Sequence, residues 1–147
     1  MTVQLEPSLG VLPHFNPDLE GAEPGEVLQF RERLRQADAI IISSPEYAHG
    51  IAGVLKDALD WIVASGELSG KPVALFNASP RASLAQTALA EVIRTMDARM
   101  VEPASIAVPL LGRNMTADAI VQDNEIAAQI REALHQISVA ISLKKTS

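Results

Sequence analysis

The fold is decided by residues 39–61, which run AIIISSPEYAHGIAGVLKDALDW. The stretch begins with a continuous apolar run that ends at Ser-Ser-Pro, a pattern typical of a strand buried on both faces of a parallel sheet. From about Gly53, apolar residues recur at the spacing of an amphipathic helix. They are Val54, Leu55, Ala58, Leu59 and Ile62. The stretch therefore predicts a strand, a loop and a helix in succession.

The same alternation continues on both sides of this stretch. Apolar runs at residues 72–76 and 105–108 predict two further buried strands, each followed by a loop-forming sequence. Helical periodicity occupies the intervals, around residues 27–34, 84–99 and 126–141. Helices that alternate with strands predict an α/β fold with a parallel sheet, and right-handed crossovers place helices on both faces. We therefore expect a three-layer α/β/α architecture.

We expect a single domain over residues 1–147, because this length is ordinary for one domain and no linker or repeat divides the chain. The segment 1–25 is expected to be irregular, since four prolines interrupt it. Within it, only residues 2–5 have the pattern of a short strand.

Composition excludes several classes of function. The net charge of -6 argues against a nucleic-acid binder, and the absence of cysteine excludes disulfides, thiolate metal sites and cysteine nucleophiles. No apolar segment is long enough to span a bilayer, and no Lys or Arg precedes Arg31, so no secretory signal is recognisable. The histidines lack the spacing of metal ligands. We therefore expect a cytoplasmic protein with no metal, membrane or nucleic-acid partner.

Two loops carry the residues best suited to bind a ligand. In open parallel sheets, ligands bind beyond the carboxyl ends of the strands. The loop at residues 44–50 follows the strand at 39–43, and the loop at residues 77–83 follows the strand at 72–76. Because these two strands should be neighbours in the sheet, we expect the loops to line one crevice.

The segment from Ser44 to Trp61 resembles the signature of the NADPH-dependent FMN reductase family, which includes quinone, chromate and azo reductases. The shared pattern is a Pro-Glu-Tyr loop, a turn of small residues, and a helix that opens Gly-x-Leu-Lys and closes on Asp-Trp. Residues 12–18 resemble the segment after the family's second strand, and residues 77–81 lie where members have a Ser/Gly-rich flavin loop. The resemblance runs from about residue 2 to the last helix.

This resemblance implies a flavodoxin-like fold and an NAD(P)H-dependent, FMN-linked oxidoreductase that reduces flavin or quinone-type acceptors. FMN and NADPH are the implied cofactors, and the partner is a small-molecule electron acceptor. No catalytic side chain is expected, because the flavin itself carries out hydride transfer. A homodimer or tetramer through the helix at 53–61 is also implied, with Trp61 packed in the interface. The residues implied to bind cofactor are Pro45, Glu46, Tyr47, Ala48, His49, Gly50, Asn77, Ser79 and Arg81.

One part of the family pattern is missing from this sequence. Members begin with a strand, a Gly-Ser-x-Arg-type loop and a helix that bind the FMN phosphate, and residues 2–5 would match their second strand. Without the first strand, the strand at 39–43 has an unpaired edge, which the N-terminal segment, a partner chain or residues upstream of Met1 could cover. The alternative function is a reduced flavodoxin-like domain that dimerises but neither binds FMN nor catalyses.

Some of these residues also have less specific interpretations. His49 is expected to face solvent, and Arg81 is either an exposed loop cation or a contact for a flavin or NADPH phosphate. Ser44, His49 and Asp60 supply the residue types of a hydrolase triad. Because the serine does not sit in a Gly-x-Ser-x-Gly elbow, we do not expect a hydrolase.

Overall fold

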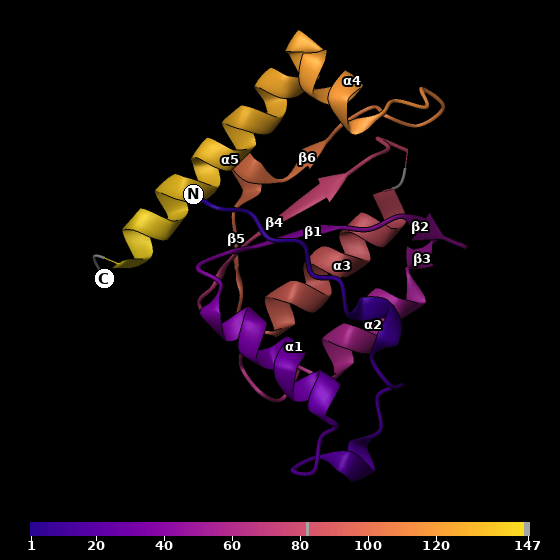
Figure 1. Cartoon of the computed structure of the whole chain (residues 1–147), viewed down its shortest axis with the longest axis vertical. Helices are drawn as coiled ribbons and strands as arrows, with labels where there is room; N and C mark the ends of the chain where they lie inside the picture. Colours follow the sequence, from indigo (N-terminus) through magenta and orange to yellow (C-terminus); the bar gives the residue numbers. More distant parts are fainter. Residues whose placement is uncertain (82, 146–147) are drawn as a thin grey trace.

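The computed structural model describes residues 1–81 and 83–145 (Figure 1). Its centre is a sheet in which β1 (Ile40–Ser43) pairs in parallel with β4 (Pro72–Asn77). This pairing confirms that the strands preceding the two candidate loops are neighbours. The register also aligns the carboxyl ends of the two strands, with Ser43 opposite Phe76, so the loops that follow them begin side by side.

The far side of β4 pairs with an interrupted strand. β5 (Arg99–Met100) bonds to the start of β4, and β6 (Ile106–Ala107) bonds to its end, both in parallel. Between them the chain leaves the sheet in a single 3-10 turn, η3 (Glu102–Ala104). At this break the hydroxyl of Ser105 accepts the N–H of Leu75 at 3.2 Å, in the position of a ladder bond.

Helices cover both faces of the sheet, as the sequence predicted. α1 (Gly25–Gln36), α2 (Gly53–Asp60) and α3 (Ser83–Thr95) lie on one face, and α5 (Asn124–Lys145) lies on the other (Figure 1). The short α4 (Ala117–Gln122) leads into α5. No helix within the described residues is long and apolar enough to cross a membrane.

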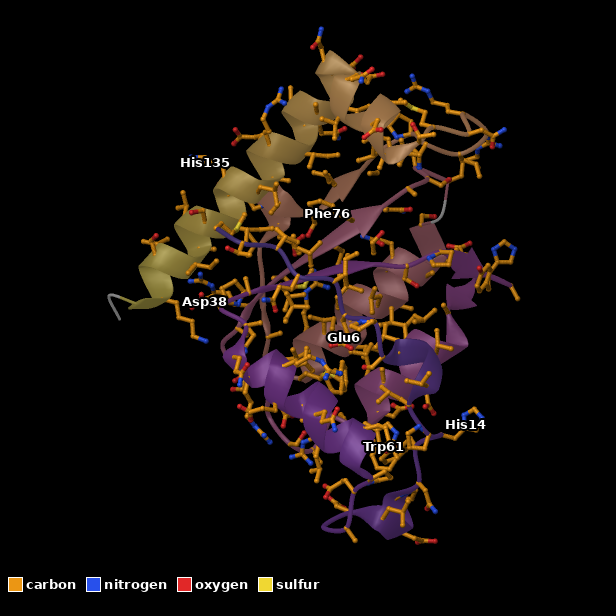
Figure 2. All side chains as sticks on the ribbon, viewed as in Figure 1. Glu6, His14, Asp38, Trp61, Phe76 and His135 are labelled. Carbon is orange, nitrogen blue, oxygen red and sulfur yellow. The ribbon has the colours of Figure 1, made fainter. Side chains whose placement is uncertain are left out.

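The central strand divides its side chains between two cores. Val73 and Leu75 pack with α1, α2 and α3, whereas Ala74 and Phe76 pack with α5. This alternation follows from the two-residue period of a strand, and Figure 2 shows Phe76 on the side of the sheet that faces α5. A strand with both faces buried is apolar on both, which explains why residues 72–76 show no polar alternation.

Two helices are shorter than their periodicity predicted. α2 ends at Asp60, and residues 61–64 form turns; α3 ends at Thr95. Asp97 follows α3 with a φ of 58°, in the left-handed region that a helix cannot continue through. Trp61 and Ile62 beyond α2 and Met96 beyond α3 still face the core, so burial alone did not mark where the helices stop.

The N-terminal segment is irregular, and the strand expected at residues 2–5 is absent. It contains two 3-10 turns, η1 (Leu9–Val11) and η2 (Pro17–Leu19), while Leu5 is 92% exposed. A strand needs hydrogen-bonded neighbours, and no described backbone group bonds to the backbone of residues 2–5. On its outer edge β1 has no strand partner among the described residues, which confirms the unpaired edge expected there.

Trp61 anchors the N-terminal segment and does not lie at a surface. Its side chain is almost fully buried, and Nε1 donates to the carbonyl oxygen of Pro13 at 2.7 Å. Its ring meets Phe15 edge to face, with 5.1 Å between centroids, and the Phe15 N–H donates to Asp57 at 2.9 Å. The expectation that Trp61 packs in a subunit interface is therefore wrong, because α2 uses this side chain to hold its own chain. Figure 2 shows Trp61 beside that segment, with His14 pointing outward.

Candidate functional site

The segment at 44–50 is a strained hairpin, whereas the sequence predicted only a loop. β2 (Glu46–Tyr47) and β3 (Gly50–Ile51) pair antiparallel around a two-residue turn, Ala48 and His49. Both turn residues have positive φ, 48° and 61°, as a type I′ turn requires. Asn-Gly is the usual sequence there, and non-glycine residues in this region cost roughly 1–2 kcal/mol each. Because Ala48 and His49 are not residues typical of this turn, the sequence did not predict it.

The hairpin exposes most of its side chains. Tyr47 is 66% exposed, and Pro45 and Ala48 also face solvent. The His49 side chain is exposed as well, which confirms the expectation for it. Glu46 differs, because only 13% of its side chain is accessible.

The Glu46 carboxylate is turned toward the start of α3. Its Oε2 accepts the backbone N–H of Ala85 at 2.9 Å, and Oε1 lies 3.2 Å from Nδ1 of His49. The bond from Ala85 is the main reason that the pKa of Glu46 lies below its usual value, with His49 and the Leu84 N–H contributing. The carboxylate therefore bears its charge at neutral pH and satisfies a donor that a helix N-terminus leaves open.

The second loop is held by its own short-range hydrogen bonds. Asn77 ends β4, is buried, and its Oδ1 accepts the N–H of Ser79 at 2.9 Å. The Ser79 hydroxyl in turn accepts the N–H of Arg81 at 3.3 Å. Arg81 is exposed, and it is the only Lys or Arg in the two candidate loops.

The structure brings the two loops together on an open surface. They leave adjacent strands and are linked by the bond between Glu46 and Ala85. A hollow of about 360 Å³ lies on the other side of β4, under α3, and Asn77 is the only predicted site residue in its lining. A second hollow of about 180 Å³ lies beside Trp61 and includes none of them. The geometry of the strand ends, and not the hollows, therefore locates the candidate site.

Sequence analysis missed the contribution of α3 to this site. The groups involved are the backbone N–H donors of Leu84 and Ala85. Any residue except proline supplies such a donor, so neither side chain carries a signal of the contact. The inward turn of Glu46 was equally hidden, because it depends on a hairpin that the sequence did not predict.

With this geometry established, the comparison with known proteins identifies the family. The sequence profile of the NADPH-dependent FMN reductase family matches residues 3–139. The chain belongs to this family. The match includes both candidate loops and all four strands of the main sheet, so the resemblance seen in the sequence extends over the whole fold.

Relatives of this FMN reductase family member are named after different electron acceptors. A probable NADPH:quinone oxidoreductase of Oryza sativa subsp. japonica is 34% identical over 136 residues, 88% of this chain and 68% of that protein. An NAD(P)H-dependent FMN reductase of Pseudomonas aeruginosa is 42% identical over 82 residues, 54% of this chain and 44% of that protein. The chain thus matches less than half the length of the Pseudomonas relative.

A solved structure supports the flavodoxin-like fold. FerB of Paracoccus denitrificans, described as a flavoenzyme NAD(P)H:(acceptor) oxidoreductase, superposes with a TM-score of 0.68 at 28% identity. The superposition covers 91% of this chain and 75% of FerB. Since nearly all of this chain superposes, the arrangement of helices around the β1–β4 pair is that of a known flavoenzyme.

Several residues of the candidate site have the chemistry to hold FMN. The exposed Tyr47 offers a flat apolar surface beside the hairpin turn. Gly50 leaves room for close approach, since a Cβ there would meet only the Tyr47 carbonyl at 3.5 Å. The N-terminus of α3, a common phosphate site, already accommodates the carboxylate of Glu46. Arg81 therefore remains as the charged group for an anion.

Proposed function

We propose that this protein is an NAD(P)H-dependent, FMN-linked oxidoreductase that reduces flavin or quinone-type acceptors. The observation that carries the proposal is the juxtaposition of the two loops at the level ends of β1 and β4. In an open parallel sheet this edge is where a cofactor binds. Family membership and the reductase names of the relatives support the reaction class.

Most of the predicted site residues have a direct physical role in this proposal. Pro45 and Tyr47 form the apolar wall against the flavin ring, and the turn at 48–50 presents backbone donors to its polar edge. Asn77 and Ser79 shape the opposite loop through their own hydrogen bonds. FMN, when bound, supplies hydride chemistry, so the protein positions the ring and leaves one face open.

We further propose that Arg81 contacts a phosphate of FMN or of NADPH. Arg81 is exposed, so its guanidinium can contact a phosphate and remain partly hydrated. Arg81→Ala separates the two roles. A rise in the dissociation constant of FMN assigns the flavin phosphate, whereas a rise in KM for NADPH but not for NADH assigns the phosphate of NADPH.

The assembly and the cellular setting are also proposals. We propose a single-domain, cytoplasmic protein that forms a homodimer or tetramer through the exposed face of α2. Val54, in the first turn of α2, is 55% exposed, and Leu84 in the first turn of α3 is equally exposed. Light scattering of the purified protein tests the assembly, and Val54→Arg should shift it to monomer if this face is the contact.

The decisive experiment measures FMN binding and NAD(P)H oxidation on the purified chain. FMN is titrated while its fluorescence and absorbance are followed, and NADPH or NADH is then supplied with a quinone such as menadione. Saturable FMN binding together with FMN-dependent NAD(P)H oxidation supports the proposal. A chain that is folded and oligomeric but neither retains FMN nor oxidises NAD(P)H would instead be the non-catalytic scaffold.

A further inference from the structure

Glu46 connects two segments that are 39 residues apart in the chain. One oxygen of its carboxylate accepts the N–H of Ala85 in the first turn of α3, and the other contacts His49 within the hairpin. Its side chain is 13% exposed, although its neighbours Tyr47 and His49 face solvent. Glu46 therefore turns inward from a segment that otherwise points outward.

The hairpin needs such a connection because its turn is strained. Ala48 and His49 both hold positive φ without being glycine, which costs roughly 1–2 kcal/mol for each residue. β2 and β3 have two residues each, too few to stabilise a hairpin by themselves. Contacts of both hairpin strands with α3 supply the missing support, and they include the bond that the Ala85 N–H donates to Glu46.

The same bond joins the two sides of the candidate site. α3 begins at Ser83, two residues after Arg81, so its first turn follows the second loop closely in the chain. The hairpin follows β1, which is the strand next to β4 in the sheet. A fixed distance between Glu46 and Ala85 therefore fixes Tyr47 relative to the second loop.

We propose that Glu46 is a positioning residue that ties the Tyr47 hairpin to the N-terminus of α3 and so sets the width of the cofactor site. The proposal assigns to Glu46 no contact with cofactor. Its consequence for FMN affinity rests on the proposed function, whereas its consequence for the position of Tyr47 does not.

The test uses Tyr47 as a reporter, since it is the only tyrosine in the chain. The protein is labelled with 3-fluorotyrosine, and the fluorine resonance is recorded without flavin in the wild type and in three variants. Glu46→Ala removes the acceptor, Glu46→Asp keeps the charge but is one methylene too short, and Glu46→Gln keeps an oxygen at the same reach. We expect the resonance to narrow and to move toward that of free fluorotyrosine in the alanine and aspartate variants, and to remain as in the wild type in the glutamine variant.

A matched control separates this role from general helix capping. Asp123 accepts the N–H of Ile126 at 3.1 Å at the N-terminus of α5, and its pKa is likewise lowered, first by that bond. Asp123→Ala should lower the melting temperature without changing the Tyr47 resonance. If Glu46→Ala does not fold, the comparison between the aspartate and glutamine variants decides the question alone.

FMN titration then measures the effect on the site. We assume that the Glu46–Ala85 bond holds most molecules in the conformation that binds FMN, and that its loss leaves about a tenth of them in it. The dissociation constant of FMN then rises about tenfold in the alanine and aspartate variants. The glutamine and Asp123→Ala variants should bind as the wild type does. An unchanged Tyr47 resonance in folded Glu46→Ala, or wild-type behaviour of Glu46→Asp, overturns the proposal. If no protein in the series binds FMN, the proposed function fails, and the fluorine spectra still decide the role of Glu46.

Discussion

The hydroxyl of Ser105 accepts the N–H of Leu75 at 3.2 Å and fills a gap in the hydrogen-bond ladder of the sheet. Leu75 lies at the centre of β4 and is almost completely buried. The strand beside it is interrupted between β5 and β6, so no backbone carbonyl of a paired strand is opposite this N–H. Ser105 also donates to the carbonyl of Val101 at 3.3 Å, which links both ends of the interruption.

Ser105→Ala should therefore destabilise the fold. The substitution leaves the Leu75 N–H buried without an acceptor, at a cost of about 1–3 kcal/mol. Chemical denaturation gives the free energy of unfolding. Ser138→Ala is the control, because this serine lies on the exposed face of α5, away from the sheet. Equal stability of the two variants would show that Ser105 does not complete the ladder.

Phe15→Ala should release the N-terminal segment from α2. Phe15 contacts Trp61 edge to face, and such aromatic pairs contribute about 0.5–1.5 kcal/mol beyond the area they bury. Trp61 is the only tryptophan, so its fluorescence reports this contact directly. We expect a red shift of its emission and a lower melting temperature. Leu5→Ala, at a fully exposed position of the same segment, should change neither; a red shift there would contradict the assignment.

Glu67 should make stability depend on pH in the acid range. Its side chain is fully buried, and Oε1 accepts from Arg31 and from Arg35, each at 2.8 Å. Burial alone would raise the pKa of Glu67, but hydrogen bonds from Ser65 and Arg31 outweigh it and lower the pKa below its usual value. The stabilisation is therefore complete above the pKa of this glutamate in the unfolded chain, about 4.3. It is lost as the pH falls through the lower pKa of Glu67 in the folded chain.

Glu67→Gln removes this titration. At pH 7 the variant should be less stable by about 1.5–3 kcal/mol, the usual contribution of hydrogen bonds to a charged group. Between pH 5 and about 3 its free energy of unfolding should fall less steeply than that of the wild type. Glu132→Gln, on the exposed face of α5, serves as control and should follow the wild-type curve. Parallel curves for wild type and Glu67→Gln would exclude Glu67 as the source.

Tyr47→Ala should weaken FMN binding by about 1–3 kcal/mol, on the scale of an aromatic contact and the area it buries. The melting temperature should hardly change, because Tyr47 is 66% exposed in the free chain. Val121→Ala, at an exposed position of α4, is the control for loss of a surface apolar group. A dissociation constant for FMN that stays the same in Tyr47→Ala would place the ring elsewhere.

The layers of this fold were predictable because each follows from a period in the sequence. The strand at residues 40–43 and the strand at 72–77 are apolar up to their last residues, Ser43 and Asn77, as strands buried by helices on both sides are expected to be. The long C-terminal helix was equally clear from its apolar spacing. These elements fix the level strand ends, and with them the location of the candidate site.

Other features depend on backbone groups and could not be read from side chains. The hairpin turn at Ala48 and His49 lacks the glycine or asparagine that usually marks positive φ. β5 contains two residues, too short for any period to be visible, whereas β6 lies within the strand predicted at residues 105–108. The role of Trp61 was assigned wrongly because its partner, a carbonyl oxygen 48 residues away, has no signature in sequence.

The outer edge of β1 has a consequence for how this protein behaves at high concentration. Its backbone groups lack a strand partner among the described residues, and Ile40, Ile41 and Ile42 carry no charge that would repel an approaching chain. Such an edge is a template for any extended apolar segment, including that of another copy. We therefore expect the tendency of the protein to aggregate in solution to depend on these three isoleucines. Because β1 leads directly into the Tyr47 hairpin, molecules that associate by this edge would also obstruct the mouth of the site.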